Sequence, residues 1–253
     1  MNSPQYLWTY IAFANIAITV MILFGIAAAL QSGGVAVERR RQIVRSAGLL
    51  LFGWLALGMV LGWLGIFRPG ADRRIPFIAI GIAVPIFIGV WMIRRSEAMR
   101  DVLHAVPQGW MVGIQTYRGL GSIFLILYGM RLLPGTFALP AGFGDVLVGF
   151  TALLVAAIYV RGNPNRDWLV AVWNLLGIAD LLIAVATGFL SAPGPLQLLS
   201  FDHPNYLVGA YPLVMIPVFA VPLSIVLHVG SLSKLSWNNE GKRVPASASF
   251  KAI

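Results

Sequence analysis

Three charged residues interrupt long apolar runs of this sequence: Arg118, Asp145 and Asp180. A charge at the centre of a membrane helix costs about 2.5–3.5 kcal/mol on insertion scales, so such a residue usually pairs with another or lines a cavity. With a helical rise of about 1.5 Å per residue, the two aspartates lie ~24 Å and ~18 Å above one membrane edge, and Arg118 lies ~12 Å above it. Because the arginine side chain is long and extends further, we predict that the three groups meet.

The neighbours of the two aspartates predict that both carboxylates point into a helix bundle. Asp145 shares a helical face with Gly149 and Asp180 shares one with Gly177, and small residues of this kind mark helix–helix contacts. Gln115 shares the helical face of Arg118, and the Asn174 amide and the Tyr211 hydroxyl could extend the polar group. The predicted ion- or substrate-binding residues are therefore Arg118, Asp145, Asp180, Gln115, Asn174 and Tyr211.

This set of residues is compatible with two kinds of role. Two carboxylates close together do not easily ionise at once, so one holds a proton near neutral pH. With Arg118 as the counter-charge, such a group could bind a cation or relay a proton. Alternatively, the arginine and the aspartates form a buried pair that only fixes which helices meet, since removing one partner of such a pair is strongly destabilising.

The composition predicts the membrane as the solvent for these charges. The chain has 253 residues, of which 58% are hydrophobic and only 11% are charged, whereas soluble domains carry about 25% charged residues. The net charge of +9 comes from basic residues in the short connectors between apolar runs, so we interpret it as an orientation signal rather than a nucleic-acid site. There is no cysteine, which excludes disulfides and thiolate chemistry.

Seven apolar runs are long enough to span a bilayer, which needs about 20 residues. We therefore predict an all-α protein with one seven-helix bundle over residues 1–235 and a polar, disordered tail over 236–253. Thirteen of the 18 basic residues fall on the side of the tail and four on the other, which puts the N-terminus outside and the C-terminus in the cytoplasm. The predicted spans are Tyr6–Leu30, Ile43–Phe67, Ile75–Ile93, Trp110–Met130, Phe137–Val160, Trp168–Leu190 and Tyr206–Leu232.

Between the third and fourth runs, apolar residues recur at helical spacing over 96–106. With Ser96 as the N-cap, this segment is expected to be a short helix, either in the cytoplasmic interface or in a solvated connector.

Enzyme signatures are missing from the sequence: it has neither H-E-x-x-H nor G-x-S-x-G. Ser224 and His228 are four residues apart and could touch on one helix face, but they lack an identifiable oxyanion site. We therefore lean against an enzyme, and we predict no cofactor and no metal site. The expected partners are the lipid bilayer and an ion or small molecule, with no nucleic acid.

The stretch Gln115-Thr-Tyr-Arg118, followed by Leu139-Pro-Ala-Gly-Phe-Gly-Asp145, resembles a pattern in uncharacterised bacterial multi-pass membrane proteins. The resemblance covers the fourth and fifth runs. It implies a bacterial inner membrane and brings no activity.

These observations lead to three hypotheses of function. The first is a small transporter or an ion or proton permeation protein with its site near Arg118, Asp145 and Asp180. The second is a membrane component without catalysis that binds a partner protein. The third is an intramembrane enzyme that acts on a lipid, which would need Ser224, His228 or a carboxylate at an opening to the lipid.

Overall fold

The computed structural model describes residues 5–70, 77–161 and 166–243, and within these ranges the chain is helical with no β-strand. The helices in chain order are α1 (Gln5–Ser32), α2 (Val37–Trp63), α3 (Phe77–Arg95), α4 (Glu97–Ala105), α5 (Gln108–Gly113), η1 (Ile114–Ser122), α6 (Ile123–Gly129), α7 (Gly135–Arg161), α8 (Asp167–Ser191), η3 (Ile216–Ala220) and α9 (Val221–Arg243).

Six helices of the described chain are long and apolar enough to cross a membrane, and they correspond to six of the seven predicted runs. The fourth run is helical too, but it is divided into α5, η1 and α6, none of which is long enough alone. The predicted start of the last run at Tyr206 is wrong, because residues 206–214 form bends and turns and the helix develops only near Ile216. Pro212 and Pro217 flank this start, and proline lacks the N–H that a helix needs.

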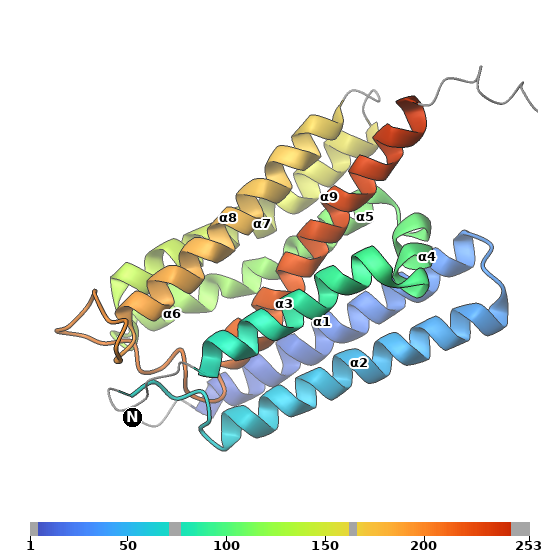
Figure 1. The fold of residues 1–253 in the computed structure, drawn as a ribbon. Coiled ribbons are helices and arrows are strands. Elements are labelled where there is room, and N and C mark those ends of the chain that lie inside the picture. The colour runs from blue at the N-terminus through green and yellow to red at the C-terminus, as the bar shows by residue number, and fades with distance from the viewer. Residues whose placement is uncertain (1–4, 71–76, 162–165, 244–253) are drawn as a thin grey trace, which may run out of the picture.

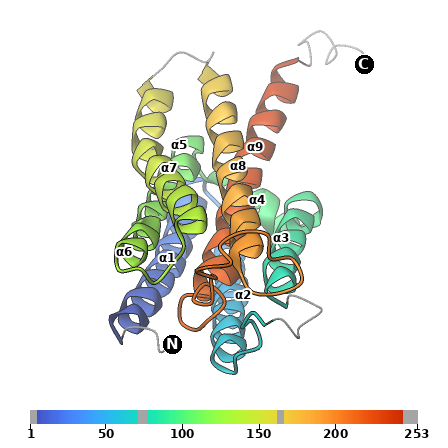
Figure 2. The same cartoon turned by 90° about the vertical axis from the view of Figure 1, so that its left-hand side faces the viewer.

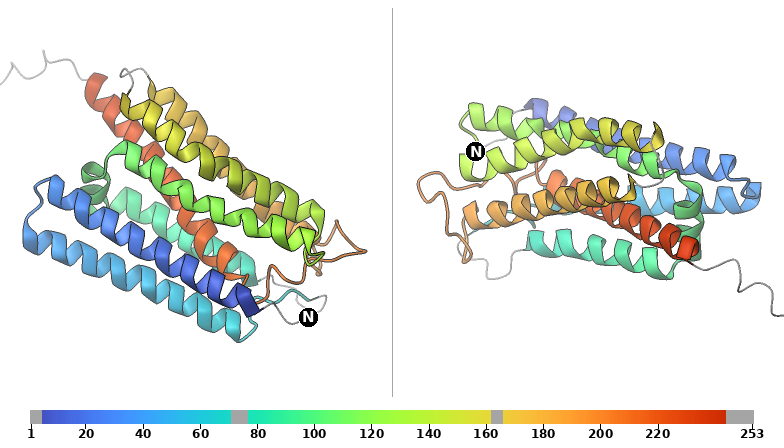
Figure 3. Two further views of the ribbon diagram at one scale, coloured as in Figure 1. Left: turned by 180° about the vertical axis from the view of Figure 1, so that it is seen from behind. Right: turned by 90° about the horizontal axis from the view of Figure 1, so that it is seen from above.

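The helices form two groups with the last helix between them (Figure 1). α1 and α2 lie side by side as an antiparallel pair on one side, and α7 and α8 form a pair on the other (Figures 1 and 2). The α5–η1–α6 segment runs between α1 and α7, as the left view of Figure 3 shows. In the span that includes η3 and α9, 61% of the most apolar 18-residue stretch is buried inside the protein. The corresponding share is 11–33% in the other five spans. This last span is therefore the core helix, and the others expose apolar side chains outward.

Glycines end the first two long helices. Gly34 and Gly65 each adopt a φ of 71°, a left-handed conformation that costs glycine little. The N–H after each glycine returns to the last turn, from Val35 to the Leu30 carbonyl and from Ile66 to the Leu61 carbonyl at 3.0 and 3.1 Å. These are the closing bonds of helix C-caps, and they reverse the chain at opposite ends of the bundle.

The predicted short helix at residues 96–106 is confirmed as α4, with Ser96 as its N-cap. The Ser96 hydroxyl accepts a hydrogen bond from the Met99 N–H at 3.3 Å. At the C-terminal end of α4, the Lys234 ammonium group donates to the His104 carbonyl at 3.1 Å. In the middle of α4, Asp101 forms an ion pair with Arg39 of α2 at 2.8 Å. α4 therefore links α2 and α9 at the end of the molecule opposite to the start of α1 (Figure 1).

The polar tail begins later than the sequence suggested. α9 continues through residues 236–243 to Arg243, so this part of the predicted tail is helical. The remaining residues of the predicted tail, 244–253, lie outside the described residues.

Candidate functional site

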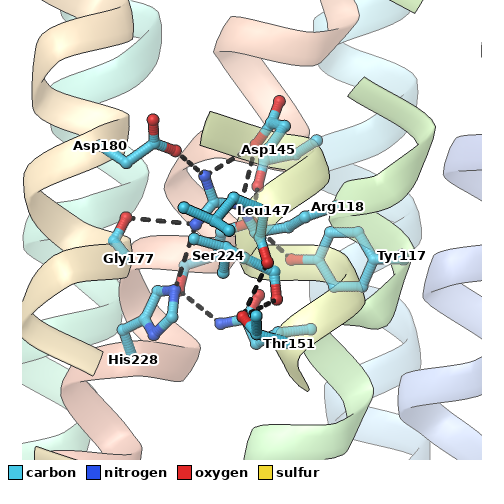
Figure 4. Close-up of polar contacts among 12 residues, drawn as sticks. Tyr117, Arg118, Asp145, Leu147, Thr151, Gly177, Asp180, Ser224 and His228 are labelled. Atoms are coloured by element: carbon cyan, nitrogen blue, oxygen red, sulfur yellow. Dashed lines mark hydrogen bonds and ion pairs between the residues drawn. The ribbon is translucent and has the colours of Figure 1, made fainter. Parts of the chain in front are cut away.

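The Arg118 guanidinium is the centre of a buried polar cluster, and all three of its nitrogens contact other polar groups (Figure 4). Nε and Nη2 both contact Oδ1 of Asp145, at 2.8 and 2.7 Å. Nη2 also donates to Oδ2 of Asp180, and Nη1 donates to the Gly177 carbonyl at 3.1 Å and approaches Nε2 of His228 at 3.4 Å. Arg118 thus connects η1 with α7, α8 and α9.

The cluster carries more negative than positive charge. The Arg118 side chain is 2% exposed, whereas those of Asp145 and Asp180 are 14% and 17% exposed. One guanidinium therefore faces two carboxylates in surroundings where an unpaired charge is costly. If both carboxylates are ionised, the cluster holds a surplus of one negative charge, and this surplus lies on the more accessible groups.

Glycines make the room that the carboxylates occupy. A Cβ atom added to Gly121 of η1 would overlap with the Asp145 carboxylate, and one added to Gly144 of α7 would overlap with the Asp180 carboxylate. A Cβ on Gly149 would overlap with the backbone of η1. Gly149, one of the small residues predicted to mark helix contacts, therefore lies directly at the charged cluster, and the three glycines allow η1, α7 and α8 to approach closely.

A second group of buried polar side chains continues from the cluster along α9. His228 contacts Asn174 of α8 through Nδ1 and Oδ1 at 2.8 Å. Nδ2 of Asn174 donates to the Ser231 hydroxyl at 2.9 Å, and Gln108 of α5 donates to the same hydroxyl at 2.6 Å. Because the Asn174 carbonyl only accepts and the Arg118 guanidinium only donates, His228 is neutral with its proton on Nδ1. We call His228, Asn174, Ser231 and Gln108 the α9 polar chain.

Ser224 has other partners than the predicted one. Its hydroxyl donates to the Ala220 carbonyl at 2.9 Å, so the Tyr117 hydroxyl 2.6 Å away donates to Ser224 Oγ. Gln115 donates to the Ser224 backbone carbonyl at 3.2 Å. The two residues of the suggested Ser224–His228 pair therefore contact different groups.

The structure brings most of the predicted site residues together. Arg118, Asp145 and Asp180 meet directly, and Asn174 joins them through His228. Gln115 of η1 donates instead to the Ser224 backbone carbonyl of α9.

Tyr211, the remaining predicted residue, lies apart from the charged cluster. Its ring packs edge-on against Trp8 of α1, with the centroids 4.6 Å apart, and it lies against Gly62 of α2. The prediction placed Tyr211 in a span, but it belongs to the turns before η3, which changes its height and its neighbours.

His228, Ser231 and Gln108 were not predicted as site residues. A signal for two of them exists in the spacing of the polar residues of α9, because Ser224, His228 and Ser231 share one helix face. All three are buried, at 2%, 0% and 0% exposure.

Two irregular helices surround the charged cluster. η1, which carries Arg118, is a 3₁₀-helix of nine residues, although such runs rarely exceed three or four residues. η3 is a π-helical turn over Ile216–Ala220, and such turns are frequent at functional sites. Irregular backbone at membrane depth is tolerated where it is buried in protein or lines a cavity.

Asp145 forms part of the wall between two cavities. The larger has a volume of about 180 Å³ and lies between the cluster and the connectors 67–70 and 192–196, with mostly apolar walls from α3, α6, α7 and α8. The smaller has a volume of about 40 Å³ and lies among α1, η1, η3 and α9. The residues that line both are Asp145, Leu181, Ile216 and Val221.

In the described ranges, no group of three or more His, Cys, Asp or Glu residues forms a possible metal site. With its long apolar helices and a buried charged cluster, the chain has the architecture of a multi-pass helical membrane protein. The chain belongs to the family described as Domain of unknown function (DUF8737), whose match covers residues 75–236. That range contains the whole arginine cluster and the α9 polar chain. No curated protein and no solved structure matched the chain.

Proposed function

We propose that this chain is a small membrane transport protein in which Asp145 and Asp180 hold an exchangeable positive charge, a proton or a small cation. The observation that carries the proposal is the ratio of charges in the buried cluster: one guanidinium against two carboxylates. A purely structural ion pair needs one carboxylate for one guanidinium. The second carboxylate needs a further positive charge or a proton, because hydrocarbon does not stabilise an unpaired ion.

The position of Asp145 supports exchange of that charge. Its side chain lines both cavities, so a proton or cation on it has space on two sides. Arginine side chains stay charged in proteins, and five contacts hold that of Arg118 in place. The guanidinium is therefore the fixed countercharge, and the carboxylates are the groups that titrate or exchange.

The larger cavity supports a small and largely apolar solute. Aromatic and aliphatic side chains such as Phe67, Phe124 and Phe137 form its walls, and Asp145 is a polar group at its inner side. Ligand sites are typically apolar cavities with a few placed polar groups. A solute bound there would lie next to the carboxylate whose charge changes, which is the requirement for coupling its movement to a proton or cation.

The membrane arrangement is part of the same proposal. The α5–η1–α6 segment, residues 108–129, would cross the membrane as a broken helix and give seven crossings. Discontinuous helices form the binding sites of many transporters. The end of the bundle that carries α4 has most of the basic residues, among them Arg39, Arg94 and Arg161. This end would face the cytoplasm of a bacterial inner membrane, with the N-terminus outside.

The test is proton movement in liposomes that contain the purified chain and a pH-sensitive dye. We expect the wild-type protein to dissipate an imposed pH gradient faster than empty liposomes, and Asp180→Asn to lose this activity while its unfolding temperature stays within a few degrees of wild type. Asp167→Asn is the matched control, because Asp167 belongs to the same helix but begins its first turn. Full activity in a folded Asp180→Asn protein would refute the assigned role.

A second candidate function is a membrane component that binds a partner protein and uses the cluster only for architecture. The contacts of all three Arg118 nitrogens favour it, because they hold η1, α7, α8 and α9 together. Under this reading Asp145→Asn and Asp180→Asn lower stability, and the wild-type liposomes show no transport of protons or cations. The separate partners of Ser224 and His228 disfavour a lipid-acting enzyme that uses these two residues together.

A further inference from the structure

The smaller cavity beside Asp145 has mostly apolar walls with a few polar groups. Besides Asp145, it is lined by Asn15, Tyr10, Tyr117 and Ser224. Its volume of about 40 Å³ exceeds the ~10–15 Å³ that a single water molecule requires on the same measure. The cavity therefore has room for a small cation together with water.

The hydroxyl groups in this wall have already donated their hydrogens. Ser224 donates to the Ala220 carbonyl, and Tyr117 consequently donates to Ser224. Tyr10 donates to the Leu120 carbonyl at 2.6 Å. Each phenolic oxygen keeps lone pairs, so these groups can only accept a further contact.

Asn15 contributes an acceptor that has no donor. Its side chain is 3% exposed, and its Nδ2 donates to the Ile11 carbonyl at 2.7 Å. Because a carbonyl only accepts, this bond fixes which side of the amide is nitrogen. The opposite atom, Oδ1, is buried without a hydrogen-bond partner within the described residues. A buried acceptor of this kind costs about 1–3 kcal/mol unless something fills the position.

The charges around the cavity indicate which kind of ligand could fill the position beside Asn15 Oδ1. Arg118 also lines the cavity, but each of its three nitrogens already contacts Asp145, Asp180, Gly177 or His228. Oxygen acceptors without free hydroxyl or guanidinium donors repel anions and suit a hard cation. With both carboxylates ionised, the cluster has one surplus negative charge, which a monovalent cation neutralises and a divalent one would overcompensate.

The backbone around the cavity points the same way. η1 contributes Tyr117, Arg118 and Gly121, and η3 contributes Ile216 and Ala220. Irregular or unwound helices are the elements that coordinate Na⁺ at membrane depth in transporters, because they release carbonyl groups from helical hydrogen bonds. Here a 3₁₀-helix and a π-turn both border one small cavity.

We propose that the smaller cavity is a binding site for a monovalent alkali cation, formed by the Asn15 Oδ1, the Asp145 carboxylate and the Tyr117 hydroxyl oxygen. Because Asp145 also lines the larger cavity, a cation in this site changes the charge that a solute meets there. This coupling rests on the proposed transport function, whereas the binding of the cation does not.

The experiment is thermal unfolding of the purified full-length chain in detergent, in NaCl, KCl or choline chloride at equal ionic strength. A ligand that binds only the folded protein raises its stability with the logarithm of concentration. We expect NaCl or KCl to raise the unfolding temperature saturably relative to choline chloride. An equal effect of all three salts overturns the proposal, because it would reflect ionic strength alone and leave water as the occupant.

Variants of Asn15 locate the site. Asn15→Leu is expected to abolish the difference between alkali and choline salts, and Asn15→Asp to lower the half-saturating concentration by about tenfold, equivalent to ~1.4 kcal/mol. Thr19→Val is the control, because Thr19 is buried one turn further on α1 and does not line the cavity. If Asn15→Leu fails to fold, Asn15→Asp decides: an unchanged half-saturating concentration overturns the site. Cation binding without any transport would instead contradict only the proposed function.

Discussion

The two sides of Arg118 differ in how their polar side chains are connected, although each has a buried acceptor without a hydrogen-bond partner among the described residues: Oε1 of Gln108 on one side and Oδ1 of Asn15 on the other. Toward α4, the α9 polar chain joins His228, Asn174, Ser231 and Gln108 in consecutive hydrogen bonds of 2.6–2.9 Å. On the other side, Asp145 borders two cavities, and Asn15 has an acceptor without a donor. A connected polar network makes a core rigid and unique, whereas unfilled acceptors beside empty space are where a ligand or proton can enter. The first side therefore positions Arg118, and the second side offers the exchangeable charge.

Removing Arg118 should have the largest effect, because both sides depend on it. We expect Arg118→Gln to lower the free energy of unfolding by about 3–5 kcal/mol, since two carboxylates lose their buried countercharge. Chemical unfolding in detergent measures this. Arg131→Gln is the control, because Arg131 is exposed in the connector after α6. If the Arg118 variant is as stable as the control, then the cluster does not depend on the guanidinium and the comparison fails.

Adding one methyl group beside Asp180 tests the close packing of the carboxylates. Gly144→Ala should cost about 1–3 kcal/mol of stability through overpacking, because the new Cβ overlaps with the Asp180 carboxylate. Gly53→Ala in α2 is the matched control, since nothing lies within 4 Å of its Cβ position. Unfolding temperatures of the two variants provide the measurement, and equal values would show that Asp180 moves away freely.

The α9 polar chain should affect stability without affecting transport. Ser231→Ala removes the acceptor for Gln108 and Asn174, and unsatisfied buried donors cost about 1–3 kcal/mol. We place its effect at the lower end, because each amide keeps a second bond, from Asn174 to the Val170 carbonyl and from Gln108 to the Ser231 carbonyl. Liposome activity per folded molecule should remain at the wild-type level. A loss of activity greater than the loss of folded protein would assign the chain a direct part in transport.

The smallest effect is expected at α4, far from the cluster. Lys234→Met removes the ammonium group that donates to the last carbonyls of α4, and charges at a helix C-terminus contribute about 0.3–1 kcal/mol. Proteolysis of the connector before α5 should become faster, while salt-dependent unfolding stays unchanged. Unaltered proteolysis would indicate that α4 is held by its apolar contacts, such as Leu103, alone.

The sequence predicted the parts of the molecule that follow from solvent and periodicity. Six apolar runs became long helices, and Ser96 became the N-cap of α4. Arg118, Asp145 and Asp180 were brought together because helical rise and the cost of buried charge leave few alternatives. These arguments need no knowledge of which helices are neighbours.

The rest depends on packing that a single sequence does not contain. The 3₁₀ conformation of η1 arises where its backbone meets α7 at Gly149, a contact between residues far apart in the chain. His228 became a partner of Arg118 because α9 lies at the centre of the bundle, and its periodicity alone gave only the face. Tyr211 was misplaced because prolines delayed the start of the last helix.

The nine 3₁₀ residues of η1 also make this segment longer than an α-helix of the same number of residues. A 3₁₀-helix rises about 2.0 Å per residue and an α-helix about 1.5 Å, so rewinding this stretch would shorten the segment by ~4.5 Å and swing Arg118 around the axis. This shortening would move the guanidinium away from the two carboxylates. The distance between spin labels at Gly109 and Gly129 should then decrease when a cation or solute is added. An unchanged distance would show that η1 keeps its 3₁₀ conformation.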